Sequence, residues 1–129
     1  MVLLSILWSA TCETRTYMGY TDKKQQCSQI SSDASAKLST KVELVVHCRG
    51  RQVGSPGLTY SRKYVEQPFV IKSSSKNDLA GYIANVYDQC GLRPARSKED
   101  FSILFTVDNY KTMRVDFQDK MVDLVEGKC

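Results

Sequence analysis

The short motifs that mark many enzymes and metal sites are missing from this sequence of 129 residues. It has a single histidine and no close cysteine pair of the C-x2-C kind, which argues against a structural zinc site and a thioredoxin-type redox site. No G-x-x-x-x-G-K-[ST], G-x-G-x-x-G or H-E-x-x-H motif occurs either. The sequence therefore predicts no cofactor, no metal site and no catalytic residue, and it favours binding over catalysis.

Long hydrophobic runs, low-complexity segments and internal repeats are also absent. The longest apolar stretch, residues 3–10, is about half of the roughly 20 residues that a transmembrane helix needs. A composition with 42% hydrophobic and 25% charged residues is typical of a folded globular domain. We therefore expect one domain over residues 13–129 and no membrane span.

Residues 1–12 allow two interpretations, a secretory signal remnant or the first buried strand of the domain. The apolar stretch gives way to small residues, as in a signal peptide, although no basic residue precedes it. Cleavage after Cys12 would place Ala10 and Cys12 at the two small-residue positions and would leave four cysteines. Both interpretations stay open.

Five cysteines are spread widely along the chain, which favours disulfide bonds. Disulfides form in oxidising compartments, so the sequence predicts a secreted protein, with a cytoplasmic protein as the alternative. The pairing cannot be deduced from spacing. The candidates for disulfide formation are Cys27, Cys48, Cys90 and Cys129.

Several segments have the pattern of strands. Residues 14–20 are rich in threonine and tyrosine, and residues 41–49 alternate between apolar and polar side chains. A further strand is expected over 60–72, where Pro68 indicates an edge or a bulge. Residues 101–117 read as a β-hairpin.

Two segments have helical spacing. Residues 78–90 carry an apolar face and are followed by Gly91, a helix stop. Residues 22–38 carry a thinner stripe made of Cys27, Ile30, Ala34 and Leu38. The tail from 118 to 129 is left undecided, with a short helix as one option. In order, these elements predict an α+β fold in which two helices pack on one face of a four- to five-stranded, mostly antiparallel sheet, of the ferredoxin-like or split β-α-β kind.

Positive charge gathers in the middle of the chain. The formal net charge is +4, and residues 49–98 hold nine lysines and arginines against three acids. Such an asymmetry attracts an anionic partner or simply forms a solvated surface. Aromatic residues interleave with cations here, a combination that stacks bases and neutralises phosphates. The candidate binding surface is Arg49, Arg51, Tyr60, Arg62 and Lys63.

His47 is the one histidine around which a catalytic set would have to be built. Together with Arg49 and Glu43 on the same strand it suggests the acid–base groups of a small ribonuclease. The competing interpretation is an exposed polar residue on the open face of a sheet. A small nuclease or hydrolase is therefore kept as a second alternative function.

The four candidate cysteines, the apolar start and the order of elements resemble, in outline, the killer-toxin-like secreted effector proteins of plant-pathogenic fungi. The resemblance carries over no functional residues. It implies a secreted, disulfide-stabilised and non-enzymatic protein, effector-like or toxin-like, that binds a component of a host or competitor, with a protein as the expected partner. The first alternative is an intracellular ferredoxin-like module that binds nucleic acid or another protein. The sequence leaves the oligomeric state open.

Overall fold

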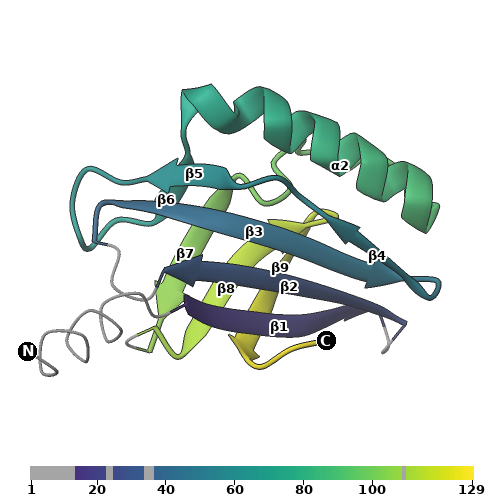
Figure 1. The fold of residues 1–129 in the computed structure, drawn as a ribbon, viewed down its shortest axis with the longest axis horizontal. Helices are drawn as coiled ribbons and strands as arrows, with labels where there is room; N and C mark the ends of the chain where they lie inside the picture. The colour runs from purple at the N-terminus through teal and green to yellow at the C-terminus, as the bar shows by residue number, and fades with distance from the viewer. Residues whose placement is uncertain (1–13, 23–24, 34–36, 109) are drawn as a thin grey trace, which may run out of the picture.

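The computed structural model describes residues 14–22, 25–33, 37–108 and 110–129. In these residues a meander of antiparallel strands closes into a barrel, and one α-helix lies over it (Figure 1). The helical elements are η1 (Ser73–Ser75) and α2 (Lys76–Cys90). The strands are β1 (Thr14–Asp22), β2 (Gln26–Asp33), β3 (Ser39–Cys48), β4 (Arg51–Gly54), β5 (Leu58–Ser61), β6 (Phe69–Ile71), β7 (Ile103–Val107), β8 (Thr112–Phe117) and β9 (Lys120–Glu126).

The barrel has eight strand positions, although nine described strands form it, because β4 and β5 together occupy one position beside β3. Both pair with β3, β4 along its second half and β5 along its first half. From β5 onward each strand pairs with the next, and β9 returns to β1 through Tyr17↔Glu126 and Met18↔Val125. The architecture is therefore an up-and-down antiparallel barrel.

This fold overturns the predicted two-helix sandwich, and the main error lies at residues 22–38. The chain forms the end of β1 and the whole of β2 there instead of a helix. Every second residue of β2 points into the barrel, and three of these four buried residues are polar: Gln26, Ser28, Ile30 and Ser32. A strand whose inward side chains are polar shows no apolar alternation, so the sequence pattern could not reveal it.

Other elements agree more closely with the sequence pattern. The strand at 41–49, the helix at 78–90 and the hairpin at 101–117 are confirmed as β3, α2 and β7–β8. The strand expected over 60–72 is interrupted, since β5 ends at Ser61 and β6 starts just after Pro68. The undecided tail is strand β9. The option of a strand at residues 3–10 lies outside the described residues.

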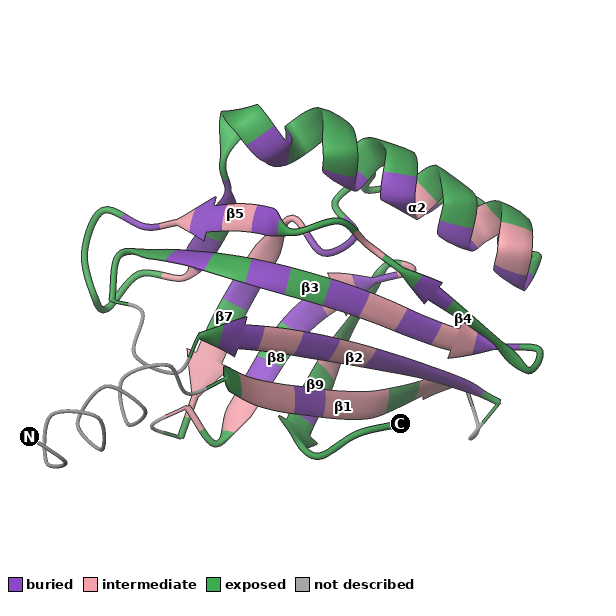
Figure 2. Ribbon diagram, in the orientation of Figure 1, coloured by how far each residue is buried: buried purple, intermediate pink, exposed green. Residues whose placement is uncertain are grey.

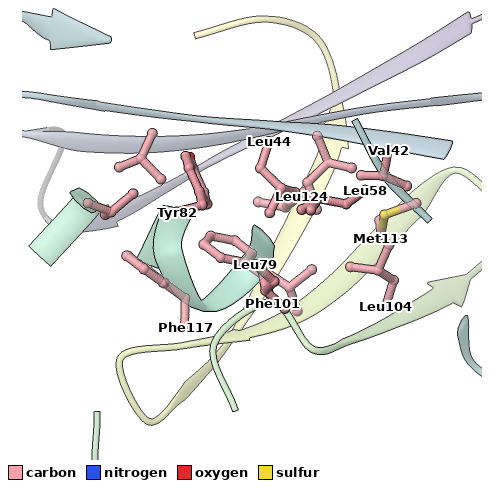
Figure 3. Close-up of a cluster of buried hydrophobic side chains, with 14 of the residues drawn as sticks. Val42, Leu44, Leu58, Leu79, Tyr82, Phe101, Leu104, Met113, Phe117 and Leu124 are labelled. Atoms are coloured by element: carbon pink, nitrogen blue, oxygen red, sulfur yellow. The ribbon is translucent and has the colours of Figure 1, made fainter. Parts of the chain in front are cut away.

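The interior of the barrel is filled by side chains. Figure 2 shows buried and more exposed positions alternating along β3, and Figure 3 shows side chains from several strands and α2 meeting in one cluster. A cavity of about 20 Å³ lies beside Thr40, whose buried hydroxyl has no hydrogen-bond partner among the described residues. That volume holds about one water molecule. The largest completely buried side chains are Tyr60, Phe101, Phe117, Ile30, Leu44, Leu58, Leu104 and Leu124.

The helix α2 belongs to the same core. Its buried residues Leu79, Tyr82, Val86 and Cys90 recur at helical spacing and face the barrel. The hydroxyl of Tyr82 donates to the carbonyl of Val53 on β4 (2.8 Å), so the helix also covers β4. The helix ends where the sequence predicted, because Gly91 adopts the left-handed conformation with φ 65°.

The barrel end near the start of β3 is held together by a buried arginine. Arg62 is 7% exposed, and its guanidinium donates to the carbonyl of Lys37 (2.5 Å), the carbonyl of Gln67 (3.3 Å) and the hydroxyl of Tyr110 (2.9 Å). These three partners come from three different connections between strands. Tyr17 of β1 adds a hydrogen bond to the carbonyl of Tyr110 (2.7 Å). One side chain therefore connects most of this end of the barrel.

We expect Arg62→Met to lower the free energy of unfolding by about 2–3 kcal/mol, because it removes three partly buried hydrogen bonds from a charged donor at once. Methionine keeps apolar contact with the Phe69 ring, over which the guanidinium now lies at 4.1 Å. Urea denaturation measures the change. The control is Lys63→Met at the exposed neighbouring position, which should cost less than about 0.5 kcal/mol. Equal losses in the two variants would contradict this role for Arg62.

Several tyrosine hydroxyls are withdrawn from water. Tyr60 donates to the carbonyl of Phe101 (2.6 Å), and burial raises the pKa of both Tyr60 and Tyr82 above the ordinary value of 10.0. Burial, assisted by a hydrogen bond to Asp100, raises the pKa of Tyr87 to about 12. The folded state therefore keeps these protons at a pH where the unfolded chain loses them.

Alkaline pH should consequently destabilise the protein. A raised folded-state pKa gives stability that is complete below the unfolded pKa, near 10, and is lost as the pH rises through the folded pKa. We expect urea unfolding to show a loss of roughly 2 kcal/mol between about pH 9 and pH 11. Tyr60→Phe should make this fall shallower. A stability that stays flat over this range would contradict the burial of the three phenols.

Candidate functional site

Two disulfides lie at the other end of the barrel. Cys48, at the end of β3, pairs with Cys90 at the end of α2, and Cys27 of β2 pairs with Cys129. The predicted disulfide bonds are thus present, and they join residues 42 and 102 positions apart. On a chain-entropy estimate, closing loops of these lengths destabilises the unfolded state by roughly 4 and 5 kcal/mol.

Next to the disulfides is a cleft of about 290 Å³. We call it the basic cleft. Its polar lining, among the residues whose side chains the structure describes, consists of two arginines, the single histidine, three glutamines and a tyrosine, with no acidic side chain. It is lined by Tyr20, Gln25, Gln26, Cys27, His47, Cys48, Arg49, Gly50, Arg51, Gln52 and Cys129.

The tight turn between β3 and β4 places the cations of this cleft. Cys48 pairs with Arg51, so only Arg49 and Gly50 form the turn, with φ of 49° and 71°. Two positive φ angles match a type I′ hairpin turn, whose twist fits that of the flanking strands. His47 follows from the same register, since it lies between Cys27 on β2 and Gln52 on β4.

The two arginines also contact the C-terminal end of α2. Arg51 Nη1 donates to Gln89 Oε1 (2.6 Å). The Arg49 guanidinium lies so close to Gly91 that a Cβ atom there would overlap it. A cation at this position is favoured by the negative end of the helix dipole. The helix therefore holds both guanidinium groups beside the cleft.

The five residues of the predicted binding surface do not gather in one place. The structure brings Arg49 and Arg51 together with His47 in the basic cleft. It buries Tyr60 and Arg62 inside the barrel, near the start of β3, and leaves Lys63 exposed. Leu58, Tyr60 and Arg62 share one face at the period of two that marks inward positions. This period of two was the sequence signal that could have identified Tyr60 and Arg62 as buried residues.

Four polar residues of the cleft were not predicted from the sequence: Tyr20, Gln25, Gln26 and Gln52. They come from β1, from the residue just before β2, from β2 and from β4, which strand pairing brings together. For Gln52, Gly50 was a usable signal, because a glycine between Arg49 and Arg51 indicates a tight turn. Nothing local predicted the other three.

The surroundings of His47 do not assemble the predicted acid–base set. Glu43 lies on the same face of β3 but four residues away, or roughly 13 Å along a strand. The lining residues that the structure describes include no serine, threonine or carboxylate side chain that would act with the imidazole. Within the described ranges, no group of three or more histidine, cysteine or acidic residues is placed to hold a metal ion.

A scan against protein-family models and searches of curated proteins and of solved structures gave no match. Among the described residues, no helix has the length and hydrophobicity to cross a membrane.

The disulfides can be checked by counting thiols in the native protein. Alkylation under denaturing, non-reducing conditions should label at most one cysteine per chain, Cys12, because the other four are paired. Peptide mapping by mass spectrometry should recover the Cys27–Cys129 and Cys48–Cys90 links. The reduced protein, as the control, should show every cysteine of the chain labelled. Free Cys48 or Cys90 in the non-reduced sample would contradict the structure.

Proposed function

We propose that this protein is a small secreted protein, stabilised by its two disulfides, that acts by binding an acidic protein partner and not by catalysis. The observation that carries the proposal is the basic cleft, which combines Arg49, Arg51 and His47 with three glutamine amides and, among its described lining residues, no acidic side chain. Guanidinium and amide groups are the donors that recognise carboxylates. A preorganised cluster of them fits an acidic segment of a partner.

The filled barrel supports binding at the outer surface. Eight-stranded barrels either fill their interior with side chains or hold one small ligand there. In this protein Tyr60, Phe101 and Phe117 occupy the interior, and the cavity near Thr40 has space for about one water molecule. This packing favours an external site over a carrier of small molecules.

Secretion is supported by the disulfides. Two intramolecular disulfides are consistent with an extracellular protein. The interpretation of residues 1–12 as a signal remnant adds to this part of the proposal but falls outside the described residues. An effector-like or toxin-like action on a host or competitor rests on the killer-toxin resemblance, for which only the apolar start and the cysteine positions still count, because the order of elements differs from the predicted one.

The test is binding of poly-L-glutamate, measured by calorimetry at low salt. Arg51→Glu should weaken binding by about fivefold or more, because it reverses one charge beside the cleft. The matched control is Lys63→Glu, an equal charge change outside the cleft, which should alter the affinity less than about twofold. Circular dichroism establishes that both variants are folded.

Two results would overturn this function. One is equal affinity of Arg51→Glu and Lys63→Glu for poly-L-glutamate, which would leave the cleft without a role. The other is tighter binding of a single-stranded oligonucleotide than of poly-L-glutamate, with an affinity that falls steeply with salt. That outcome would favour the nucleic-acid alternative, in which Tyr20 stacks on a base.

A further inference from the structure

The helix α2 has a second apolar stripe beside its buried face. Ala80, Ile83, Ala84 and Tyr87 follow each other at the spacing i, i+3, i+4 and i+7, so they share one face. The two alanines are exposed, and Ile83 and Tyr87 are half-buried. In Figure 2 much of the helix surface that faces away from the barrel is exposed. Ile83 packs against the edge of the core, whereas the two alanines are left uncovered.

The stripe forms one wall of a groove. Two hollows, of about 370 and 340 Å³, run along it and share Ala80, Ile83, Lys98 and Asp100. The opposite wall comes from β6, β7 and the segment 94–103, with Val70, Ile103 and Pro94 among its apolar members. We call this feature the α2 groove.

Apolar surface continues from the α2 groove onto the outside of the barrel. Val70 of β6 pairs with Ile103 of β7 and is 43% exposed. Phe105 lies two residues further along β7, on the same face, and is 36% exposed. Contiguous apolar surface of this kind marks an interaction site more often than scattered single residues do.

The two acidic residues that line the groove, Glu99 and Asp100, differ in how far they are accessible to a partner. Asp100 is 1% exposed, and its carboxylate accepts hydrogen bonds from the Tyr87 hydroxyl and from the backbone of Gln118 (2.9 Å). Glu99 is exposed; the Ser102 hydroxyl donates to its backbone carbonyl (2.7 Å) and lies 3.3 Å from a carboxylate oxygen. The Asp100 carboxylate is therefore engaged inside the protein, and among the described lining residues Glu99 alone offers an exposed carboxylate.

The two lysines of the groove, in contrast, form no ion pair with any described residue. Lys76 lies at the start of α2, and Lys98 lines both hollows. Lys98 has φ 56°, a left-handed conformation that is unfavourable for a lysine and is accompanied by a hydrogen bond to the carbonyl of Ala95 (3.3 Å). Two ammonium groups are thus available to carboxylates of a partner.

We propose that the α2 groove docks an amphipathic helix of a partner protein, with small apolar side chains facing the groove and carboxylates facing Lys76 and Lys98. The stripe from Lys76 to Tyr87 is roughly 16 Å long, which matches about three turns of a partner helix. An added strand is disfavoured because β6 and β7, the strands at the groove, are each paired on both sides. The α2 groove is separate from the basic cleft, so this inference stands independently of the proposed function.

The experiment uses a synthetic, end-capped helical peptide with a leucine and alanine face flanked by glutamates. The comparison peptide carries lysines in place of the glutamates. Fluorescence anisotropy gives the dissociation constants, and amide shifts in NMR spectra locate the site. We expect the acidic peptide to shift residues 80–84 and 98–103 and to bind at least about tenfold more tightly than the basic one.

Matched variants on the same helix test the location. Ala84→Glu places a bulky acid in the groove and should weaken the acidic peptide by about tenfold or more. Asn85→Glu, the control, changes the exposed neighbouring position outside the lining residues and should have an effect of less than about twofold. Lys98→Glu should weaken the acidic peptide and strengthen the basic one.

Several outcomes would overturn the proposal: no binding of the acidic peptide at millimolar concentration, equal binding of both peptides, or no difference between Ala84→Glu and Asn85→Glu. Displacement of the peptide by dodecanoate at micromolar concentration would assign the groove to an anionic lipid instead. Arg51→Glu separates the two proposals, because it should leave the peptide affinity unchanged while it weakens poly-L-glutamate. Loss of peptide binding in Arg51→Glu would place the peptide in the basic cleft.

Discussion

The pairing of β9 with β1 is the interaction on which the rest of the structure depends. It closes the meander into a ring through Tyr17↔Glu126 and Met18↔Val125. Gly19 makes this possible, since a Cβ atom there would lie 2.7 Å from the carbonyl oxygen of Asp123 and from a methyl of Leu124. The Cys27–Cys129 bond holds the chain just beyond β9 against β2. Among the described strands the closed ring leaves no long free edge, which disfavours the addition of a strand from another chain.

The helix α2 has two roles in this arrangement. Its inner face, with Leu79, Tyr82 and Val86, completes the core, and the Cys48–Cys90 bond fastens its last turn to β3. Its outer stripe forms the α2 groove, and its C-terminal end holds the two arginines of the basic cleft. Both candidate surfaces therefore depend on this helix, one through its lining residues and the other through contacts with Arg49 and Arg51. A helix fixed in this way presents side chains with little loss of conformational entropy on binding.

The parts of the fold that could be predicted are those whose local pattern agrees with their place in the barrel. β3 has apolar residues on its inward face, and α2 has a helical apolar face followed by Gly91. In β2 the local pattern disagrees with the place in the barrel, because Ser28 and Ser32 point inward. The few apolar residues of this segment have helical spacing by coincidence. Arg62 led to the opposite error, because its charge predicted an exposed position and the residue is buried. Its donors are satisfied by three connections that only the folded chain brings together.

The sequence by itself determined the chemistry that is available: four cysteines able to pair, one histidine, a basic middle section, and the elements β3, α2 and β7–β8. Only the tertiary structure decided which of these groups meet. Pairing partners, barrel closure and the direction in which a polar side chain points depend on contacts between residues far apart in the chain, whereas periodicity reports only near neighbours. For this reason Arg49, Arg51 and His47 became one cleft, Tyr60 and Arg62 became core, and the outer stripe of α2 became a groove.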